Sequence, residues 1–193
     1  MKHLIQKEMK KLLAIVAVVF FSLSALQAQE SMFNLGDKVV SAGIGFGSTL
    51  YTSGTYISRG VPPISLSYEQ AVKDGILDKG VIGVGGWVGY TSYKYQVLDW
   101  GYKYSNIIFG VMGAFHYPLV DKLDTYAGIG LGYNIVSANE FGINSGIEYN
   151  VSGSSIVFAG MIGARYYFTD QIAVFAQAGY GIAYFTVGAS FRF

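Results

Sequence analysis

The chain has 193 residues, a length typical of a single domain. It contains 26 Gly, 16 Tyr and 13 Phe but no Cys, and only 13% of its residues are charged, against about 25% in ordinary soluble domains. The absence of Cys excludes disulfides, thiolate metal sites and thiolate catalysis. Beyond residue 28 the chain carries nine Lys or Arg and eleven Asp or Glu, a balance that gives no indication of a nucleic-acid partner.

The first 28 residues have the pattern of a secretory signal peptide. Four lysines lie before or at the start of an apolar run over residues 12–26, and Ala28 is a small residue suited to precede a cleavage site. The run is shorter than the roughly 20 residues of a transmembrane helix, which disfavours an uncleaved anchor. Met9, followed by two lysines, is a more typical signal start than Met1. We predict a helical signal peptide at 1–28 and one domain at 29–193.

After a short lead over residues 29–36, apolar residues alternate with small or polar ones. This period of two is typical of β-strands with one apolar face. No further apolar run is long enough for a transmembrane helix. We predict eight strands, at 37–47, 61–72, 81–95, 104–117, 125–137, 154–168, 172–181 and 184–193. Hairpin connections between consecutive strands predict an antiparallel, up-and-down arrangement.

The predicted connections differ at the two ends of the strands. Those at 73–80, 121–124 and 169–171 are short and charged, whereas those at 48–60, 96–103 and 138–153 are longer and rich in Tyr, Ser and Gly. Short turns at one end and long loops at the other are typical of outer-membrane barrels. This asymmetry predicts that both termini are periplasmic and that the long loops are extracellular.

The last strand shows the alternation most clearly. Its odd-numbered residues, from Phe185 to Phe193, are apolar, and its even-numbered residues, from Tyr184 to Arg192, are mostly small or polar. A soluble lipocalin-like carrier would turn the apolar faces inward, and we keep it as an alternative. The low charge and the aromatic last residue favour apolar faces that meet lipid. We predict an all-β fold, an eight-stranded antiparallel up-and-down transmembrane β-barrel.

The opposite face of each strand should line the barrel interior. Eight strands enclose a space that side chains can fill. Glycines at every second position, as in 43–47 and 128–132, leave room there for Trp87, Met112, Tyr126 and Phe175. The same glycines are not a nucleotide fingerprint, because no helix follows them. We therefore predict a lumen filled by side chains, with no conducting pore.

Three charged residues lie within predicted strands rather than in turns. Glu69, Arg165 and Arg192 each share the face of the small or polar residues of their strand. All three lie near the predicted periplasmic ends, and buried charges need partners. We predict a lumenal charge cluster in which Glu69 pairs with Arg165, with Arg192 or with both, and which His116 or Gln177 can join. Three separately hydrated groups are the alternative.

His116 is the only histidine after residue 28. An enzyme that modifies lipid A, such as a deacylase or acyltransferase, would need a nucleophile within hydrogen-bond reach of such a base. In the deacylase pattern a serine stands two residues after the histidine, where this chain has Pro118. We predict a structural histidine and no enzyme activity, and we assign no catalytic residue, cofactor or metal.

Aromatic residues gather toward the ends of the predicted strands. We interpret them as two interfacial girdles. The first contains Tyr90, Tyr93, Tyr95, Trp100, Tyr102 and Tyr104, and the second contains Phe115, Tyr117, Tyr133, Tyr166, Phe168, Phe191 and Phe193. Tyr133 fits the second girdle less well, because it lies toward the far end of its predicted strand. A carbohydrate-binding aromatic platform would instead need these rings on loops.

The chain resembles the small outer-membrane β-barrels of the OmpX/OmpA type, in the form common among Bacteroidetes and described as an outer membrane protein beta-barrel domain or as porin-family-like. The resemblance rests on the signal peptide, the eight alternating strands, the segments 113–117 and 126–133, and the last strand. Thr186, Gly188, Phe191 and Phe193 match the terminal signal that the barrel assembly machinery reads in this class.

The resemblance implies an integral protein of the outer membrane. Its partners would be outer-membrane lipids and lipopolysaccharide, the barrel assembly machinery and periplasmic chaperones, with no nucleic acid, and it would be a monomer. The predicted role is structural, adhesive or surface-interacting and non-enzymatic. The lipid A-modifying enzyme and the soluble lipocalin-like carrier remain the alternatives.

Overall fold

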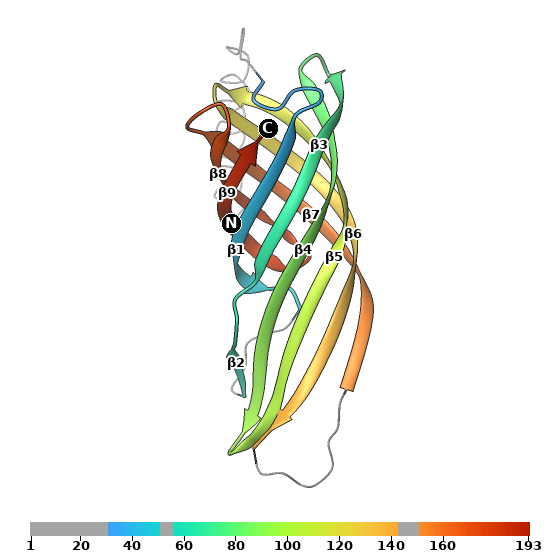
Figure 1. Cartoon of the computed structure of the whole chain (residues 1–193), viewed down its shortest axis with the longest axis vertical. Coiled ribbons are helices and arrows are strands. Elements are labelled where there is room, and N and C mark those ends of the chain that lie inside the picture. The colour runs from blue at the N-terminus through green and yellow to red at the C-terminus, as the bar shows by residue number, and fades with distance from the viewer. Residues whose placement is uncertain (1–30, 51–55, 143–150) are drawn as a thin grey trace, which may run out of the picture.

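The computed structural model describes residues 31–50, 56–142 and 151–193. The predicted signal peptide lies outside these residues. Within them no helix is long and apolar enough to cross a membrane. The described chain is built of antiparallel strands that wrap into a tilted, elongated barrel (Figure 1).

Of the nine strands in the described residues, eight close a ring in the order β1-β3-β4-β5-β6-β7-β8-β9, with β9 hydrogen-bonded back to β1. Every pairing is antiparallel, and each strand of the ring is paired with its neighbour along the chain. The strands are β1 (Lys38–Ser48), β3 (Ile64–Ile76), β4 (Gly80–Val97), β5 (Trp100–Val120), β6 (Leu123–Phe141), β7 (Val151–Tyr167), β8 (Ile172–Tyr180) and β9 (Ala183–Arg192). The predicted eight-stranded antiparallel barrel is confirmed.

Several predicted connections are partly strand in the structure. β3 continues to Ile76, and β6 begins at Leu123 and continues to Phe141. Within the predicted loop 48–60, a ninth strand, β2 (Ile57–Arg59), pairs with β4 outside the ring. The predicted loop 96–103 is wrong, because β4 and β5 stay paired as far as Val97 and Trp100. Only Leu98 and Asp99 join them, and Leu98 has a φ of 57°. The polar residues that suggested a loop belong to strands that continue past the apolar part of the sheet.

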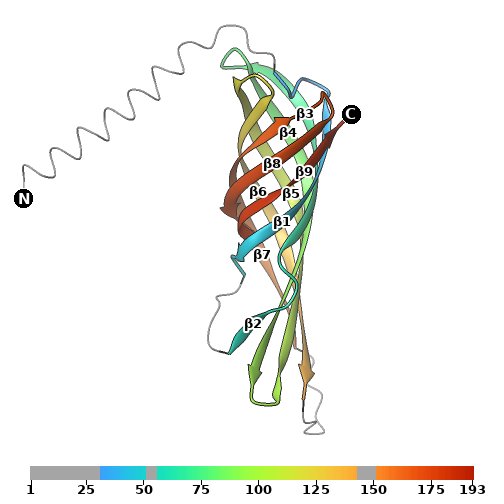
Figure 2. The same cartoon turned by 90° about the vertical axis from the view of Figure 1, so that its left-hand side faces the viewer.

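The strands differ in length, and this gives the molecule its shape. β1, β8 and β9 have 11, 9 and 10 residues, whereas β4, β5, β6 and β7 have 17 to 21. The long strands continue beyond the short ones as a curved sheet, at the end of the barrel away from the C-terminus (Figures 1 and 2). We call this part of β4 to β7, together with β2, the extension.

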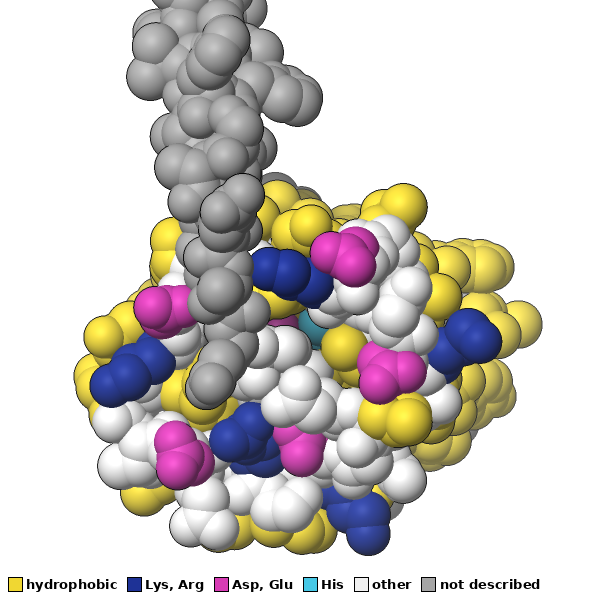
Figure 3. All heavy atoms as spheres, turned by 90° about the horizontal axis from the view of Figure 1, so that it is seen from above, with side chains coloured by type: hydrophobic (Ala, Val, Ile, Leu, Met, Phe, Trp, Pro, Cys, Tyr) yellow, Lys and Arg dark blue, Asp and Glu magenta, His cyan; other side chains and the backbone are white. Residues whose placement is uncertain are grey.

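The alternation of residues sorts side chains between the two surfaces of the barrel. Large apolar side chains point outward and are exposed, with 76% of Ile129, 72% of Phe158 and 53% of Phe46 accessible. The opposite face carries the buried residues Glu69, His116 and Arg165. At the end that bears the C-terminus, acidic and basic side chains are spread over the surface inside a border of hydrophobic ones (Figure 3).

The proposed first girdle needs correction. Tyr90 shares the outward face of Val88, but the other five residues continue the inward face of Trp87 and of its neighbours on β5. They lie on the extension, where the rings of Tyr93 and Tyr104 stack at 4.9 Å and those of Trp100 and Tyr102 approach to 5.0 Å. The period of two continues through these residues in the structure, but the predicted loop at 96–103 interrupted it, so their inward direction was not predicted.

The small residues of the inward face make room for large ones. A Cβ atom on Gly43 would lie 2.8 Å from Cζ of Phe175 and 2.7 Å from Cγ2 of Thr186. We therefore expect Gly43→Ala to destabilise the barrel by about 1–3 kcal/mol. Gly160 is the matched control, because a Cβ there meets nothing within 4 Å. Urea unfolding of the two variants in vesicles tests this, and equal stabilities would contradict tight packing around Gly43.

Candidate functional site

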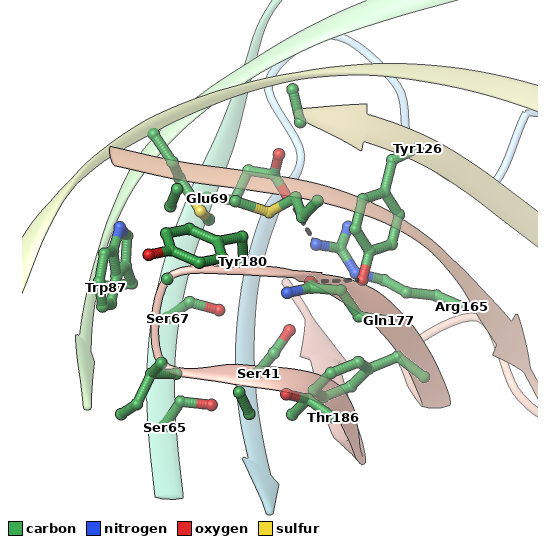
Figure 4. Close-up of a pocket in the computed structure, with 18 residues that line it drawn as sticks. Ser41, Ser65, Ser67, Glu69, Trp87, Tyr126, Arg165, Gln177, Tyr180 and Thr186 are labelled. Atoms are coloured by element: carbon green, nitrogen blue, oxygen red, sulfur yellow. Dashed lines mark hydrogen bonds and ion pairs between the residues drawn. The ribbon is translucent and has the colours of Figure 1, made fainter. Parts of the chain in front are cut away.

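The lumen is filled by side chains from nearly every strand of the ring. Trp87, Met112, Tyr126 and Phe175, the four residues predicted to fill it, all line one remaining cavity of about 80 Å³. Figure 4 shows Trp87 opposite Tyr126 and Arg165, with hydroxyl and amide side chains between them. The indole Nε1 of Trp87 is buried there without a hydrogen-bond partner among the described residues. The cavity has room for a few water molecules.

At the end of the lumen nearer the C-terminus, four charged side chains form a closed ring of ion pairs. Glu69 of β3 contacts Nε2 of His116 at 2.8 Å and Nη2 of Arg165 at 2.5 Å. Asp124 of β6 contacts Nδ1 of His116 at 2.8 Å and Nη1 of Arg165 at 3.1 Å. We call these four residues the ionic ring. None is more than 4% exposed.

Hydrogen-bond geometry indicates the charge state of the ionic ring. Each nitrogen of His116 faces a carboxylate oxygen, and a neutral imidazole has only one N–H to donate. The imidazolium form supplies a donor to both carboxylates. Two cations then balance two anions, and every carboxylate oxygen accepts one bond from the ring. Such mutual pairing is what buried charges require.

The predicted charge cluster contained Glu69, Arg165 and Arg192. The structure brings Glu69 and Arg165 together and adds His116, but it separates Arg192 from them. Arg192 donates to Asp37 at 3.2 Å and to the backbone oxygens of Asp170 and Met32. Its guanidinium lies 5.3 Å from the ring centre of Tyr167, the next inward-facing residue beyond Arg165 on β7. Arg192 is therefore removed from the cluster, because nearer acceptors at the end of its strand satisfy it.

Gln177, the other candidate member, accepts a hydrogen bond from Tyr126 at 3.1 Å instead of joining the ionic ring. Tyr126 nevertheless packs against the ionic ring. The centre of its aromatic ring lies 4.8 Å from Cζ of Arg165 and 5.4 Å from the centre of the His116 imidazole. Glu69, Arg165, Tyr126 and Gln177 all line the cavity, so the tyrosine lies between the ionic ring and the amide without closing the ring off from the cavity.

Two members of this site were missing from the sequence interpretation. Asp124 was assigned to a turn, but β6 begins at Leu123 and places Asp124 on the inward face of Tyr126. Phe33 belongs to the segment assigned as a lead, yet it is fully buried. Its ring lies 4.3 Å from that of His116 and 5.9 Å from Cζ of Arg165. Phe33 therefore caps the ionic ring.

The site offers little scope for acid–base or metal chemistry. Both nitrogens of His116 are bonded to carboxylates, so neither is free to accept a proton from a serine. Among the described residues, no group of three or more His, Asp or Glu side chains is arranged to hold a metal ion. What the arrangement does is link β3, β5, β6 and β7 across the lumen.

The four residues of the predicted assembly signal divide between the two faces of β9. Thr186 is buried and faces the lumen with Gly188, which opposes Phe175 of β8. Phe191 and Phe193 point outward, with 46% and 56% of their surface exposed. Phe193 also exchanges two backbone hydrogen bonds with Lys38, so the end of β9 closes the ring against β1.

The filled lumen leads us to expect no steady ion conductance. Phe33, the ionic ring and the rings of Tyr126, Trp87 and Phe175 follow one another along the interior. The purified protein reconstituted in a planar bilayer should give no reproducible conductance step. Steps of one size that disappear after heat denaturation would show that the lumen is open.

Comparisons with known proteins agree with this architecture. No family model and no curated protein matches the chain. Two solved structures of Ail, the attachment invasion locus protein of Yersinia pestis, are similar to it at 14% identity and cover 83% of this chain and 100% of that chain. Their TM-scores are 0.54 for the complex with the heparin analogue sucrose octasulfate and 0.53 without it.

The N-terminal β-barrel domain of Pseudomonas aeruginosa OprF, at 15% identity, covers 82% of this chain and 98% of that domain. Its TM-score of 0.48 is too low to carry an argument. At these identities the likeness concerns the fold alone. The described chain therefore has the fold of an eight-stranded outer-membrane β-barrel.

Proposed function

We propose that the chain is a non-enzymatic, integral outer-membrane β-barrel. Both termini lie in the periplasm, and the extension projects from the cell surface with a structural, adhesive or surface-interacting role. The observation that carries this proposal is the exposed apolar face around the ring, combined with buried charges inside it.

The dimensions of the apolar face support a membrane location. On β5 the outward-facing residues from Tyr117 to Ile107 include Phe115, Val111 and Phe109 and no charged residue. Ten residues at about 3.3 Å each, tilted by about 40°, span about 25 Å, which matches the apolar band of such barrels. A soluble lipocalin-like carrier would bury this face, and the exposures of Ile129 and Phe158 argue against it.

A role at the cell surface is supported by the extension. It places a sheet of four long strands beyond the apolar band, where loops and strand ends meet the medium. Ail, which shares the fold, was crystallised with a heparin analogue. The lipid A-modifying enzyme is the weaker candidate, because His116 has no free nitrogen.

Outer-membrane lipids, lipopolysaccharide, the barrel assembly machinery and periplasmic chaperones are the partners that go with this proposal, and the protein would act as a monomer. The resemblance to the Bacteroidetes form stays a prediction.

Cysteine labelling tests the proposed orientation, because the chain has no cysteine of its own. Leu98 and Leu77 are both exposed turn residues with positive φ, at opposite ends of β4. A membrane-impermeant maleimide should label Leu98→Cys on intact cells and should label Leu77→Cys only after permeabilisation. If only Leu77→Cys is labelled on intact cells, the protein has the opposite orientation to the one proposed. If neither labelled variant is found in the outer-membrane fraction, the proposed location is wrong.

The terminal signal is tested by replacing its last residue. Phe193→Asp should lower the amount of heat-modifiable protein in the outer membrane more than Phe191→Leu does, because the aspartate removes the final aromatic ring from the outward face. Equal amounts of wild type and Phe193→Asp would leave the signal without support.

A further inference from the structure

The outward face of the extension carries one polar row across four neighbouring strands. The row follows the register of the sheet, in which Lys94 of β4 is opposite Lys103 of β5. Ser58 of β2 adjoins Lys94, and Asn139 of β6 adjoins Lys103. All four side chains are exposed. We call Ser58, Lys94, Lys103 and Asn139 the cationic row.

The two lysines of the cationic row face each other without an acidic partner in the described part of the chain. Like charges directly opposite each other on a sheet are destabilising. Lys94 lies 5.6 Å above the ring of Phe141, which attracts its charge but does not neutralise it. Glu140, the nearest acid along β6, turns to the inward face, where it accepts a hydrogen bond from Trp100. The two lysines of the cationic row are thus a pair of neighbouring positive charges that a bound anion would stabilise.

The cationic row lies just beyond the apolar band. Lys103 follows the outward alternation of Ile107 and Phe109 and is four residues past Ile107 on the same strand. Four residues of a tilted strand rise by about 10 Å. A lysine stem can turn its ammonium toward the membrane from this height. The headgroup region of one leaflet is about 5–8 Å thick, so ammonium groups turned toward the membrane would reach the headgroup level. For Lys94 this means turning away from Phe141, which lies on the other side of the row.

We propose that the cationic row binds the phosphate groups of an outer-leaflet lipid that carries a phosphorylated saccharide headgroup. The lysines pair with phosphate, and the hydroxyl of Ser58 and the amide of Asn139 hydrogen-bond to saccharide hydroxyls. A lipid is favoured over a soluble partner because the row faces sideways, on the same surface as the lipid-facing band. The inference rests on the proposed orientation and adds a lipid site to it.

The test compares lipid binding by variants of the purified full-length protein in detergent. Native mass spectrometry would measure the dissociation constant for bisphosphorylated lipid A and for the same lipid after removal of its phosphates. Lys94→Gln/Lys103→Gln should weaken binding of phosphorylated lipid A about tenfold. Lys94→Arg/Lys103→Arg should retain it. Lys73→Gln/Lys122→Gln, which removes two lysines at the other end of the barrel, should have no effect.

Each other result would overturn the lipid site. Equal affinities of the wild type and Lys94→Gln/Lys103→Gln would remove the lysines from it, and equal affinities for the two forms of lipid A would exclude phosphate. Displacement of the lipid by millimolar inorganic phosphate would make the row a site for free anions. Because binding in detergent does not depend on orientation in the cell, failure of the maleimide experiment would refute the proposed function separately.

Discussion

Replacing Arg165 by Met should destabilise the barrel by about 3–5 kcal/mol, because Glu69 and Asp124 would stay buried without their shared cation. Methionine keeps much of the apolar volume of the side chain, so the loss reports mainly on charge. The free energy of unfolding in urea, measured for the protein folded in phospholipid vesicles, is the quantity to compare.

Arg192 provides the matched control for this prediction. Its pair with Asp37 is partly exposed, at 16% and 27% of the two side chains. Exposed pairs contribute at most about 1 kcal/mol, so Arg192→Met should have a much smaller effect. Similar losses for the two variants would mean that the ionic ring is no more important than a surface pair.

A double-mutant cycle would separate pairing from packing. Glu69→Gln removes one anion of the ionic ring. The double variant Glu69→Gln/Arg165→Met removes one anion and one cation. Because the two residues are in direct contact at 2.5 Å, their losses should be coupled by about 0.5–3 kcal/mol. Additive losses would show that the two residues act independently.

The strand pattern was enough to predict the fold and the direction of the lumenal side chains that lie within the predicted strands on the apolar part of the barrel. A period of two fixes the face of a residue wherever one face is apolar, and Trp87, Tyr126 and Phe175 all lie on the predicted side. The pattern does not fix where a strand ends. Asp124 was left out of the predicted cluster for this reason. The predicted strand began at residue 125, and a start one residue earlier would have placed Asp124 on the same face as Tyr126.

The remaining differences come from contacts that no local pattern encodes. Arg192, like Arg165, lies on the inward face of its strand. It is hydrogen-bonded to Asp170 and Asp37 near the end of β9 and not to Glu69. Phe33 precedes the first strand and has no periodic neighbour, so only the closed barrel reveals that its ring covers His116. The one available signal was that Phe33 is the only aromatic residue in the lead over residues 29–36.

Replacing Phe33 by Ala should uncover the ionic ring. Phe33 is fully buried, and loss of a buried phenylalanine ring typically costs about 3–5 kcal/mol. Because the segment before β1 can undock locally without unfolding the barrel, this value is an upper limit for the loss of global stability. Local exposure of His116 should therefore be the clearer result. His116 is 1% exposed in the native protein and is the only histidine outside residues 1–28.

Deuterium exchange at the C2–H of the imidazole, measured by mass spectrometry on the folded protein in vesicles, would report that exposure, because the exchange needs contact with water but no free ring nitrogen. Exchange at His116 should be very slow in the wild type and should become faster in Phe33→Ala. Phe168→Ala is the matched control, because Phe168 lies at the same end of the barrel but is 58% exposed and points outward. Circular dichroism of each variant must show an intact barrel. If exchange at His116 stays as slow in an intact Phe33→Ala barrel as in the wild type, then the cap assigned to Phe33 is wrong.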